Sequence, residues 1–281
     1  MTVVDAHHHL WAAGDGYTWL DEPPLAPIRA TFTPAMLVAE LAAAGVARSV
    51  LVEGGRCDTA EAEVLLGHAA ATPEIAGVVA WADPASPSLA VTLAGYRALP
   101  GGDRLVGVRA QVQGEAAGYL DRPDVRAGLA VIGAAGLAFD LVVRVDQLAP
   151  AARVAAALPE VRFVLDHLGK PEIRAGGFAR WEAEIAPLAA RPNVTAKLSG
   201  LVTEADWERW TVDDLRPYVT AALDLFGPDR LMLGSDWPVC LLAGGYGEVR
   251  AAMLAALGDL SEPERAAILG DTASRVYQLT A

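Results

Sequence analysis

The sequence predicts a closed (β/α)8 barrel, the TIM-barrel fold, formed by residues 1–281 as a single domain. Eight short apolar runs alternate with longer segments rich in alanine and leucine along the 281-residue chain. No long linker, internal repeat or low-complexity tail interrupts this alternation. The length is close to the ~250 residues typical of such barrels. Eight strands separated by helices favour a closed barrel over an open, doubly wound sheet.

The eight apolar runs have the composition of strands that are buried on both faces. They are short and rich in β-branched or other large apolar residues, which is typical of strands in a parallel sheet covered by helices. The predicted strands cover residues 3–6, 49–53, 77–81, 105–111, 138–143, 162–167, 194–198 and 230–235.

Seven segments between these runs have the spacing of amphipathic helices. Apolar residues recur at positions i, i+3 and i+4, and many of the segments end at glycine or proline. The predicted helices cover residues 34–45, 60–71, 88–99, 124–136, 151–160, 178–191 and 213–227. The longest irregular stretch, residues 12–34, contains Tyr17 and Trp19. A loop of this length after a first strand is more often functional than idle.

The composition excludes several classes of protein. Hydrophobic residues make up 53% of the chain and charged residues 20%, whereas disordered proteins have the opposite balance. The net charge is −13 and no run of five basic residues occurs, so we expect neither nucleic acid nor an anionic membrane surface as a partner. No signal peptide or transmembrane segment is expected. Cys57 and Cys240 lack the spacing of a disulfide framework, which predicts a cytoplasmic protein.

Polar side chains gather at the carboxyl end of nearly every predicted strand. In a (β/α)8 barrel the active site lies at this end. A chain with a purely structural role would not need such a collection. The side chains at these positions are Asp5, His7, His9, Glu53, Trp81, Asp83, Arg109, Gln111, Asp140, Asp166, His167, Lys197, Ser199 and Asp236.

The segment VDAHHHLW, at the first strand, holds three of the five histidines in the chain. Residues two apart on a strand point to the same side, so His7 and His9 can reach one point in the mouth of the barrel. This arrangement suits a metal site or a pair of proton-transferring groups. We expect His8 to point the other way and to pack, and Asp5 to lie deeper on the side of His7 and His9.

Two later strand ends supply a further histidine and an aspartate. His167, in the segment LDHLGKP, follows an apolar strand, and Lys170 comes shortly after it as one of only two lysines. Lys170 is predicted either to contact a ligand or to be a solvated loop residue. Asp236, in GSDWP, closes the last strand, where a carboxylate is well placed as a general base.

Other strand-end residues are candidates for holding a substrate. Arg109 and Gln111 are in phase on one strand, and the guanidinium fork suits a carboxylate or a lactone oxygen. No G-x-S-x-G nucleophile motif, phosphate-binding loop or dinucleotide fingerprint is present. The predicted substrate-binding residues are Arg109, Lys170, Tyr17, Trp19, Glu53, Asp140 and Lys197.

In their order along the chain, these motifs resemble the amidohydrolase superfamily. The resemblance runs nearly end to end, through VDAHHHLW, YTWL, GVRAQVQ, FDLVV, FVLDHLGKP, AKLSGL and GSDWPVC. More closely, the chain looks like the amidohydrolase-2 branch. That branch contains sugar-lactone hydrolases such as L-fuconolactonase and L-rhamnonolactonase, and the pyrone-dicarboxylate lactonase. The resemblance implies that the catalytic residues and candidate metal ligands are His7, His9, His167 and Asp236.

The resemblance also bears on the cofactor. Binuclear members of the superfamily bridge two metals with a carboxylated lysine or a glutamate from a middle strand, where this chain has Arg109. We therefore do not expect a two-metal site. Three histidines and a carboxylate suit one divalent metal ion, above all Zn²⁺. The branch is also similar to enzymes that work without bound metal, so the sequence leaves open one ion or none.

The expected reaction is the hydrolysis of a sugar lactone, a small-molecule substrate, with Asp236 as the general base for the attacking water. A metal ion or the histidines would polarise the lactone carbonyl. Ala110, where histidine is frequent in the branch, and Glu53, where glutamine is common, leave the identity of the sugar open. One alternative is a zinc-dependent decarboxylase of an aromatic acid, and another is a barrel that only binds a sugar acid or a partner. A homo-oligomer is compatible with the sequence.

Overall fold

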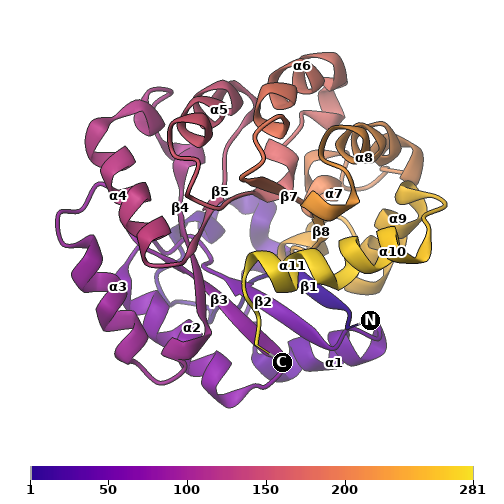
Figure 1. Ribbon diagram of the computed structural model, residues 1–281. Coiled ribbons are helices and arrows are strands. Elements are labelled where there is room, and N and C mark those ends of the chain that lie inside the picture. Colours follow the sequence, from indigo (N-terminus) through magenta and orange to yellow (C-terminus); the bar gives the residue numbers. More distant parts are fainter. Residues whose placement is uncertain (1, 281) are drawn as a thin grey trace.

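Eight parallel strands form one sheet in the computed structural model, which describes residues 2–280 (Figure 1). Each strand pairs with the next one in the sequence. The strands are β1 (Val4–His8), β2 (Arg48–Val52), β3 (Ile75–Trp81), β4 (Leu105–Ala110), β5 (Ala138–Leu141), β6 (Phe163–Leu165), β7 (Val194–Leu198) and β8 (Leu231–Leu233). The predicted (β/α)8 TIM barrel is confirmed.

The sheet closes on itself where the first and last strands meet. The backbone N–H of His9 donates to the carbonyl oxygen of Trp237 at 2.7 Å, and that of Asp236 donates to the carbonyl oxygen of His7 at 2.8 Å. Backbone groups of three candidate site residues therefore complete the barrel, which fixes His7, His9 and Asp236 relative to one another.

Helices surround the sheet in the order expected for a barrel (Figure 1). The seven predicted helices are present, and the structure adds α7, α9, α10 and α11, of which α9 follows β8 as the eighth outer helix. The helices are α1 (Pro34–Ala43), α2 (Thr59–Ala71), α3 (Leu89–Ala98), α4 (Pro123–Ala134), α5 (Leu148–Ala157), α6 (Phe178–Ala189), α7 (Leu201–Glu204), α8 (Val212–Phe226), α9 (Tyr246–Leu257), α10 (Glu262–Ala266) and α11 (Thr272–Val276).

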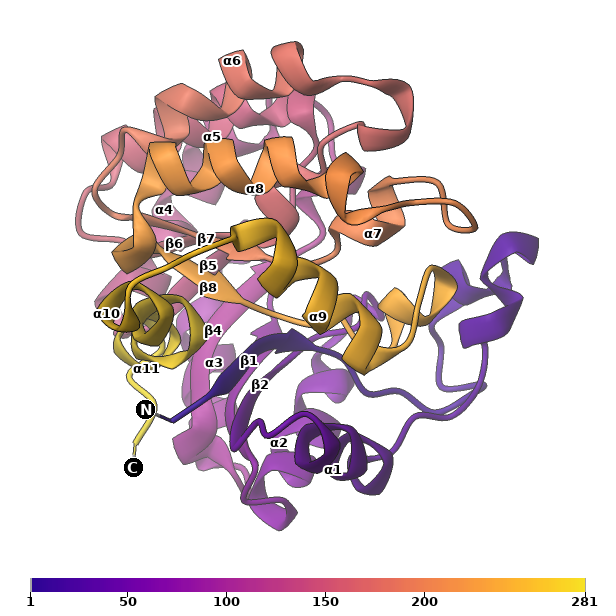
Figure 2. The same ribbon diagram turned by 90° about the vertical axis from the view of Figure 1, so that its right-hand side faces the viewer.

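The last helix closes the bottom of the barrel. Ala273, Val276 and Tyr277 pack in one apolar cluster with inward-facing strand residues such as Val4 and Val50. In Figure 2, α11 and both ends of the chain lie on one side of the barrel, and α7 lies on the other side. Since the bottom is filled by side chains, a ligand has to enter from the carboxyl ends of the strands.

Several strands end earlier than the sequence predicts. The sixth strand, predicted to reach His167, ends at Leu165, because the chain enters a tight turn there, in which His167 and Leu168 have positive φ values. The first strand instead runs two residues further than predicted, to His8.

Within residues 2–280, no helix is both long and apolar enough to cross a membrane. Cys57 is exposed and Cys240 is buried, and both are free thiols.

Candidate active site

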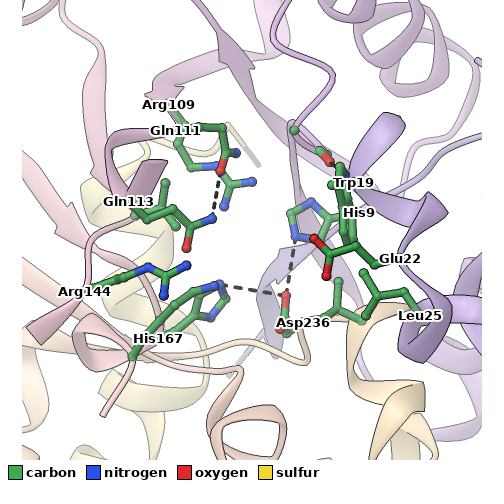
Figure 3. Close-up of a pocket in the computed structure, with 15 residues that line it drawn as sticks. His9, Trp19, Glu22, Leu25, Arg109, Gln111, Gln113, Arg144, His167 and Asp236 are labelled. Atoms are coloured by element: carbon green, nitrogen blue, oxygen red, sulfur yellow. Dashed lines mark hydrogen bonds and ion pairs between the residues drawn. The ribbon is translucent and has the colours of Figure 1, made fainter. Parts of the chain in front are cut away.

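A cavity of about 500 Å³ opens at the carboxyl ends of the strands (Figure 3). Asp236 lies at its floor, between His9 from the end of β1 and His167 from the turn after β6. The side chains and glycines that line the cavity are His9, Trp19, Glu22, Leu25, Gly54, Gly55, Arg109, Gln111, Gln113, Val142, Arg144, His167, Lys170, Asp236 and Val239.

A bulge in β1 places His7 and His9 on the inner side of the barrel. Asp5 pairs with Ser49 and His8 pairs with Leu51, so three steps along β1 pass opposite two steps along β2. The extra residue reverses the alternation of side chains. The expectation that Asp5 shares the side of His7 and His9 is therefore wrong, because it assumed an unbroken strand.

Asp5 and His8 both lie outside the barrel, between the sheet and its helices. Asp5 accepts hydrogen bonds from the hydroxyl groups of Ser235, at 2.6 Å, and Tyr246 of α9, at 3.0 Å. His8 is buried, with its Nε2 3.0 Å from the Oγ of Ser49. The predicted packing role of His8 agrees with this position.

The Nε2 atoms of three histidines converge on the carboxylate of Asp236. Its Oδ1 lies 3.4 Å from His9, 3.7 Å from His7 and 3.9 Å from His167. The Nε2 atoms of His7 and His9 are 3.1 Å apart. These four residues therefore present one cluster of donor atoms to the cavity floor.

Each histidine is oriented by a contact on its other ring nitrogen. The Nδ1 of His9 donates to the carbonyl oxygen of Val52 at 2.9 Å, and the Nδ1 of His167 is 2.9 Å from the Oγ of Ser199. The Nδ1 of His7 lies 3.3 Å from Asp166 Oδ1. Such partners hold the rings in place and leave Nε2 free for a metal or a substrate.

The donor set fits a divalent metal ion. A carbonyl oxygen can only accept, so His9 carries its proton on Nδ1, and its Nε2 lone pair faces Asp236 Oδ1. Two acceptor atoms 3.4 Å apart need a proton or a cation between them. In a tetrahedral zinc site with bonds of about 2.0–2.1 Å, ligand atoms lie roughly 3.3–3.4 Å apart. The separations among His7, His9 and Asp236, 3.1–3.7 Å, bracket this value.

The protonation states of Asp236, His7 and His167 suit a base beside two neutral rings. Burial opposes the ionisation of Asp236, but His167 and His9 beside it outweigh burial, and the pKa of Asp236 is lowered. Burial lowers the pKa of His167 to about 4, even though Asp236 favours its charged form. Burial, reinforced by Lys197, also holds the pKa of His7 well below its usual value. At neutral pH the site therefore combines the carboxylate of Asp236 with uncharged imidazoles at His7 and His167.

The sequence of this chain matches that of a known protein family. A family model described as amidohydrolase matches residues 4–279, which is nearly the whole chain. The chain belongs to the amidohydrolase family. The resemblance of its motifs to this family is therefore confirmed.

Three amidohydrolase relatives cover almost the full length of this chain. An L-fucono-1,5-lactonase from Burkholderia multivorans is 39% identical, over 98% of this chain and 96% of the relative. An L-fucono-1,5-lactonase from Burkholderia ambifaria is 37% identical, over 98% and 95%. A crystal structure of an amidohydrolase from Burkholderia multivorans with bound zinc has a TM-score of 0.94 at 36% identity, over 100% of both chains.

Backbone strain marks two turns of this amidohydrolase site. His167, Leu168 and Lys170 have φ values of 53°, 50° and 53°, and Asp236 has a φ of 58°. The left-handed conformation costs about 1–2 kcal/mol for each residue that has a Cβ atom. It persists where the surrounding structure enforces it, most often at functional sites.

A glycine makes room for the two side chains held by these turns. Gly200 has a φ of +64°, and a Cβ atom there would lie 2.5 Å from His167 Nδ1 and 3.0 Å from Asp236 Oδ2. The position therefore requires glycine both for its backbone conformation and for the close approach of His167. Gly200 is part of the site although it carries no functional group.

A layer of charged side chains lies beneath the cavity, and we call Glu53, Asp140, Asp166 and Lys197 the sealed layer. All four side chains have an exposed fraction of 0%. Lys197 Nζ donates to Asp140 Oδ2 at 2.6 Å, forms an ion pair with Asp166 Oδ1 at 3.0 Å, and lies 3.1 Å from His7 Nδ1. Arg109, which reaches the cavity, pairs with Glu53 and with Asp166 Oδ2.

The predicted substrate-binding residues thus occupy different depths. Trp19, Arg109 and Lys170 line the cavity, whereas Glu53, Asp140 and Lys197 lie in the sealed layer. Tyr17 is buried against Glu61 and does not line the cavity. The indole N–H of Trp19 donates to the carbonyl oxygen of Gly54 at 2.8 Å, which ties the 12–34 segment to the end of β2.

Several cavity residues were not singled out by the sequence, among them two from the long first loop and two that follow later strands. Glu22 and Leu25 come from the 12–34 segment, Gln113 follows β4, and Arg144 follows β5. Arg144 lies three residues beyond the end of β5, so the same rule that selected the other strand ends could have found it. Glu22 and Leu25 carried no signal beyond the length of their loop.

Proposed function

We propose that this amidohydrolase hydrolyses a sugar lactone, L-fucono-1,5-lactone or a closely related aldonolactone, and that Asp236 is the general base. The position of Asp236 carries the proposal. Its carboxylate lies at the cavity floor with a lowered pKa, within 4 Å of the Nε2 atoms of three histidines. The two L-fucono-1,5-lactonases that match over nearly the full chain support this substrate class.

Asp236 and its neighbours can carry both proton transfers of the reaction. Asp236 takes a proton from the water that attacks the lactone carbonyl, and His167 and Arg109 donate hydrogen bonds to the carbonyl oxygen as it gains negative charge. The intermediate then collapses with cleavage of the bond between the carbonyl carbon and the ring oxygen. Asp236 returns its proton to that oxygen, which becomes a hydroxyl group of the aldonate.

The remaining cavity residues hold the sugar ring. Trp19 offers an apolar face, and Gln111 and Gln113 offer amide groups that can donate to and accept from ring hydroxyl groups. The decarboxylase alternative is less favoured, because the two relatives that match nearly the full chain at 39% and 37% identity are lactonases.

We further propose that the site binds one zinc ion through His7, His9 and Asp236. His167 is a further candidate ligand, as an alternative to its hydrogen bond to the substrate. These residues supply the combination of imidazole and carboxylate donors that zinc prefers. When bound, such an ion polarises a carbonyl oxygen or lowers the pKa of water. The zinc-containing amidohydrolase structure of similar fold supports this assignment.

The proposal can be tested with a panel of aldonolactones that contain five or six carbons, followed with a pH indicator because lactone opening releases a proton. We expect rapid acid release from L-fucono-1,5-lactone or from one related sugar series. Metal analysis of the purified protein should find about one zinc per chain. No acid release from any lactone of the panel would contradict the lactonase assignment. Full activity after complete removal of metal by a chelator would assign the histidines to hydrogen bonding alone.

Two further predictions concern the whole protein. The cytoplasmic location remains a prediction from the spacing of Cys57 and Cys240. A homo-oligomer likewise remains a prediction, which light scattering of the purified protein would test directly.

A further inference from the structure

Three cationic side chains face the cavity, but their charges are not equally available to a ligand. The guanidinium of Arg109 pairs with Glu53 and, at 2.9 Å, with Asp166 Oδ2. Two carboxylates therefore share one cation, and the charge of Arg109 is already balanced. Among residues 2–280, the other two cations, Arg144 and Lys170, have no comparable partners.

Arg144 presents a free guanidinium to the cavity. Within residues 2–280, Arg144 forms its hydrogen bonds through its backbone, to Gln147, and its side chain makes no ion pair. Figure 3 shows the guanidinium beside Gln113 and His167, on the side of the cavity away from Trp19. Its charge is therefore available to an anion bound near Asp236.

Lys170 is the second available cation. Its closest carboxylate oxygen, Glu204 Oε1, lies 4.0 Å from Nζ, at the limit of an ion pair. The strained turn over residues 167–170 holds Lys170 beside His167. The backbone N–H of Lys170 donates to the carbonyl oxygen of His167 at 2.9 Å. The same turn that supplies the candidate catalytic histidine thus also supplies a cation.

Arg144 and Lys170 also border a second cavity. This second cavity has a volume of about 440 Å³, and its lining includes Asp146, Glu172, Arg180 and Glu204 as well as the two cations. Since both Arg144 and Lys170 line both cavities, they stand where the catalytic cavity adjoins the second one.

The proposed reaction changes the charge of its ligand. A lactone of a neutral sugar has no charge, whereas the aldonate formed from it is an anion next to the carboxylates of Asp236 and Glu22. We propose that Arg144 and Lys170 form a subsite for the carboxylate of the product at the edge of the catalytic cavity, away from Asp236. This inference rests on the proposed lactone hydrolysis.

The subsite can be tested with L-fuconate, made by alkaline opening of L-fucono-1,5-lactone, and with L-fucitol as a neutral alditol of the same sugar. The variants are Arg144→Gln, Lys170→Met and, as a matched control, Arg180→Gln. Arg180 lines the second cavity only and is paired with Glu172 at 3.3 Å. Calorimetry gives the affinity for each ligand, and initial rates give the KM for the lactone and the product-inhibition constant.

Arg144→Gln and Lys170→Met should each weaken L-fuconate binding about fivefold, the scale of a partly exposed ion pair. Binding of L-fucitol should change by a smaller factor, so the ratio of the product-inhibition constant to the KM should rise. Salt should weaken L-fuconate binding more in the parent protein than in the variants. Arg180→Gln should leave the ratio unchanged.

Two results would overturn the subsite. One is L-fuconate binding that is undetectable in the parent protein or equal in the parent and both variants. The other is an equal weakening of lactone and product, since that would mark a general sugar contact. Because calorimetry needs no turnover, it tests the subsite even if no lactone is hydrolysed, and a failure of the lactonase assignment is seen separately in the rate assay.

Discussion

The open cavity floor and the sealed layer beneath it contain similar residue types in opposite electrostatic situations. Asp236, at the floor, has three histidine rings around it and no lysine or arginine within ion-pair distance among residues 2–280. Asp166, in the sealed layer, lies between Lys197 and Arg109. Burial opposes ionisation of both, yet Lys197 holds the pKa of Asp166 well below its usual value. The carboxylates of the sealed layer are paired with buried cations, whereas the floor keeps a carboxylate for chemistry.

This difference predicts that the two levels respond differently to substitution. Removing one member of a buried ion pair leaves an uncompensated charge and destabilises the fold. Removing a general base leaves the fold in place and slows the reaction. Variants at the two levels can therefore separate a structural role from a catalytic one.

The largest effect on activity is expected for Asp236→Asn. Asparagine keeps the shape of the side chain but cannot accept the proton of the attacking water, so kcat/KM should fall about 10²–10⁴-fold. This corresponds to about 2.7–5.5 kcal/mol in the activation barrier. Steady-state lactone hydrolysis measures the loss, and urea denaturation should show that the variant remains folded. Full turnover by the variant would mean that another group is the base.

The largest effect on stability is expected for Lys197→Met. Methionine leaves Asp140 and Asp166 buried without their shared cation, so the free energy of unfolding should fall by about 3–5 kcal/mol. Lys170→Met, at the only other lysine, is the matched control and should cost at most about 1 kcal/mol because its ion pair is partly exposed. Urea denaturation of both variants checks the pair. Equal losses of unfolding free energy in the two variants would show that the burial of Lys197 does not make it more important for stability than Lys170.

The third prediction concerns Glu61, a buried carboxyl group that forms no ion pair within the part of the chain that the structure describes. Burial, with repulsion from Glu53, raises the pKa of Glu61 to about 8. A carboxyl group with a raised pKa in the folded state stabilises the fold below its ordinary value near 4.5, and this stability is lost as pH rises towards 8. The slope is at most about 1.4 kcal/mol per pH unit.

Glu61→Gln should therefore flatten the dependence of the unfolding free energy on pH between these two values. Urea denaturation at a series of pH values compares the variant with the parent protein. Parallel curves would show that Glu61 is ionised in the folded state. Burial without a paired cation would then not raise the pKa of this carboxyl group.

The sequence predicted which side chains face the inside of the barrel better than it predicted how deep below the cavity each one lies. A period of two along each strand indicates which side chains face inward, and this placed His7 and His9 correctly. It failed for Asp5, because nothing in the sequence signalled the bulge in β1. Phase alone also could not distinguish Lys197, sealed below His7, from a residue that reaches the cavity. Depth depends on how far each strand extends and on what packs above it.

Contacts made by the end of the chain were beyond the reach of strand patterns. The hydroxyl group of Tyr277 donates to Asp140 Oδ2 at 2.7 Å, and Lys197 Nζ lies 5.4 Å from the centre of the Tyr277 ring. A helix after the last strand supplies this residue from the bottom of the barrel. No periodicity near residue 277 indicates that its side chain reaches the sealed layer.

Tyr277→Phe gives the smallest expected effect and separates the two levels most finely. The change removes one hydrogen bond to Asp140 but leaves Lys197 in place, so the unfolding free energy should fall by about 0.5–1.5 kcal/mol. Because Tyr277 touches the sealed layer and not the cavity, kcat/KM at a temperature where both proteins are folded should change less than twofold, or about 0.4 kcal/mol. Urea denaturation and initial-rate measurements check the two values. A large loss of activity without a loss of stability would show that the sealed layer affects the reaction through His7. The cavity floor and the sealed layer would then not have separate roles.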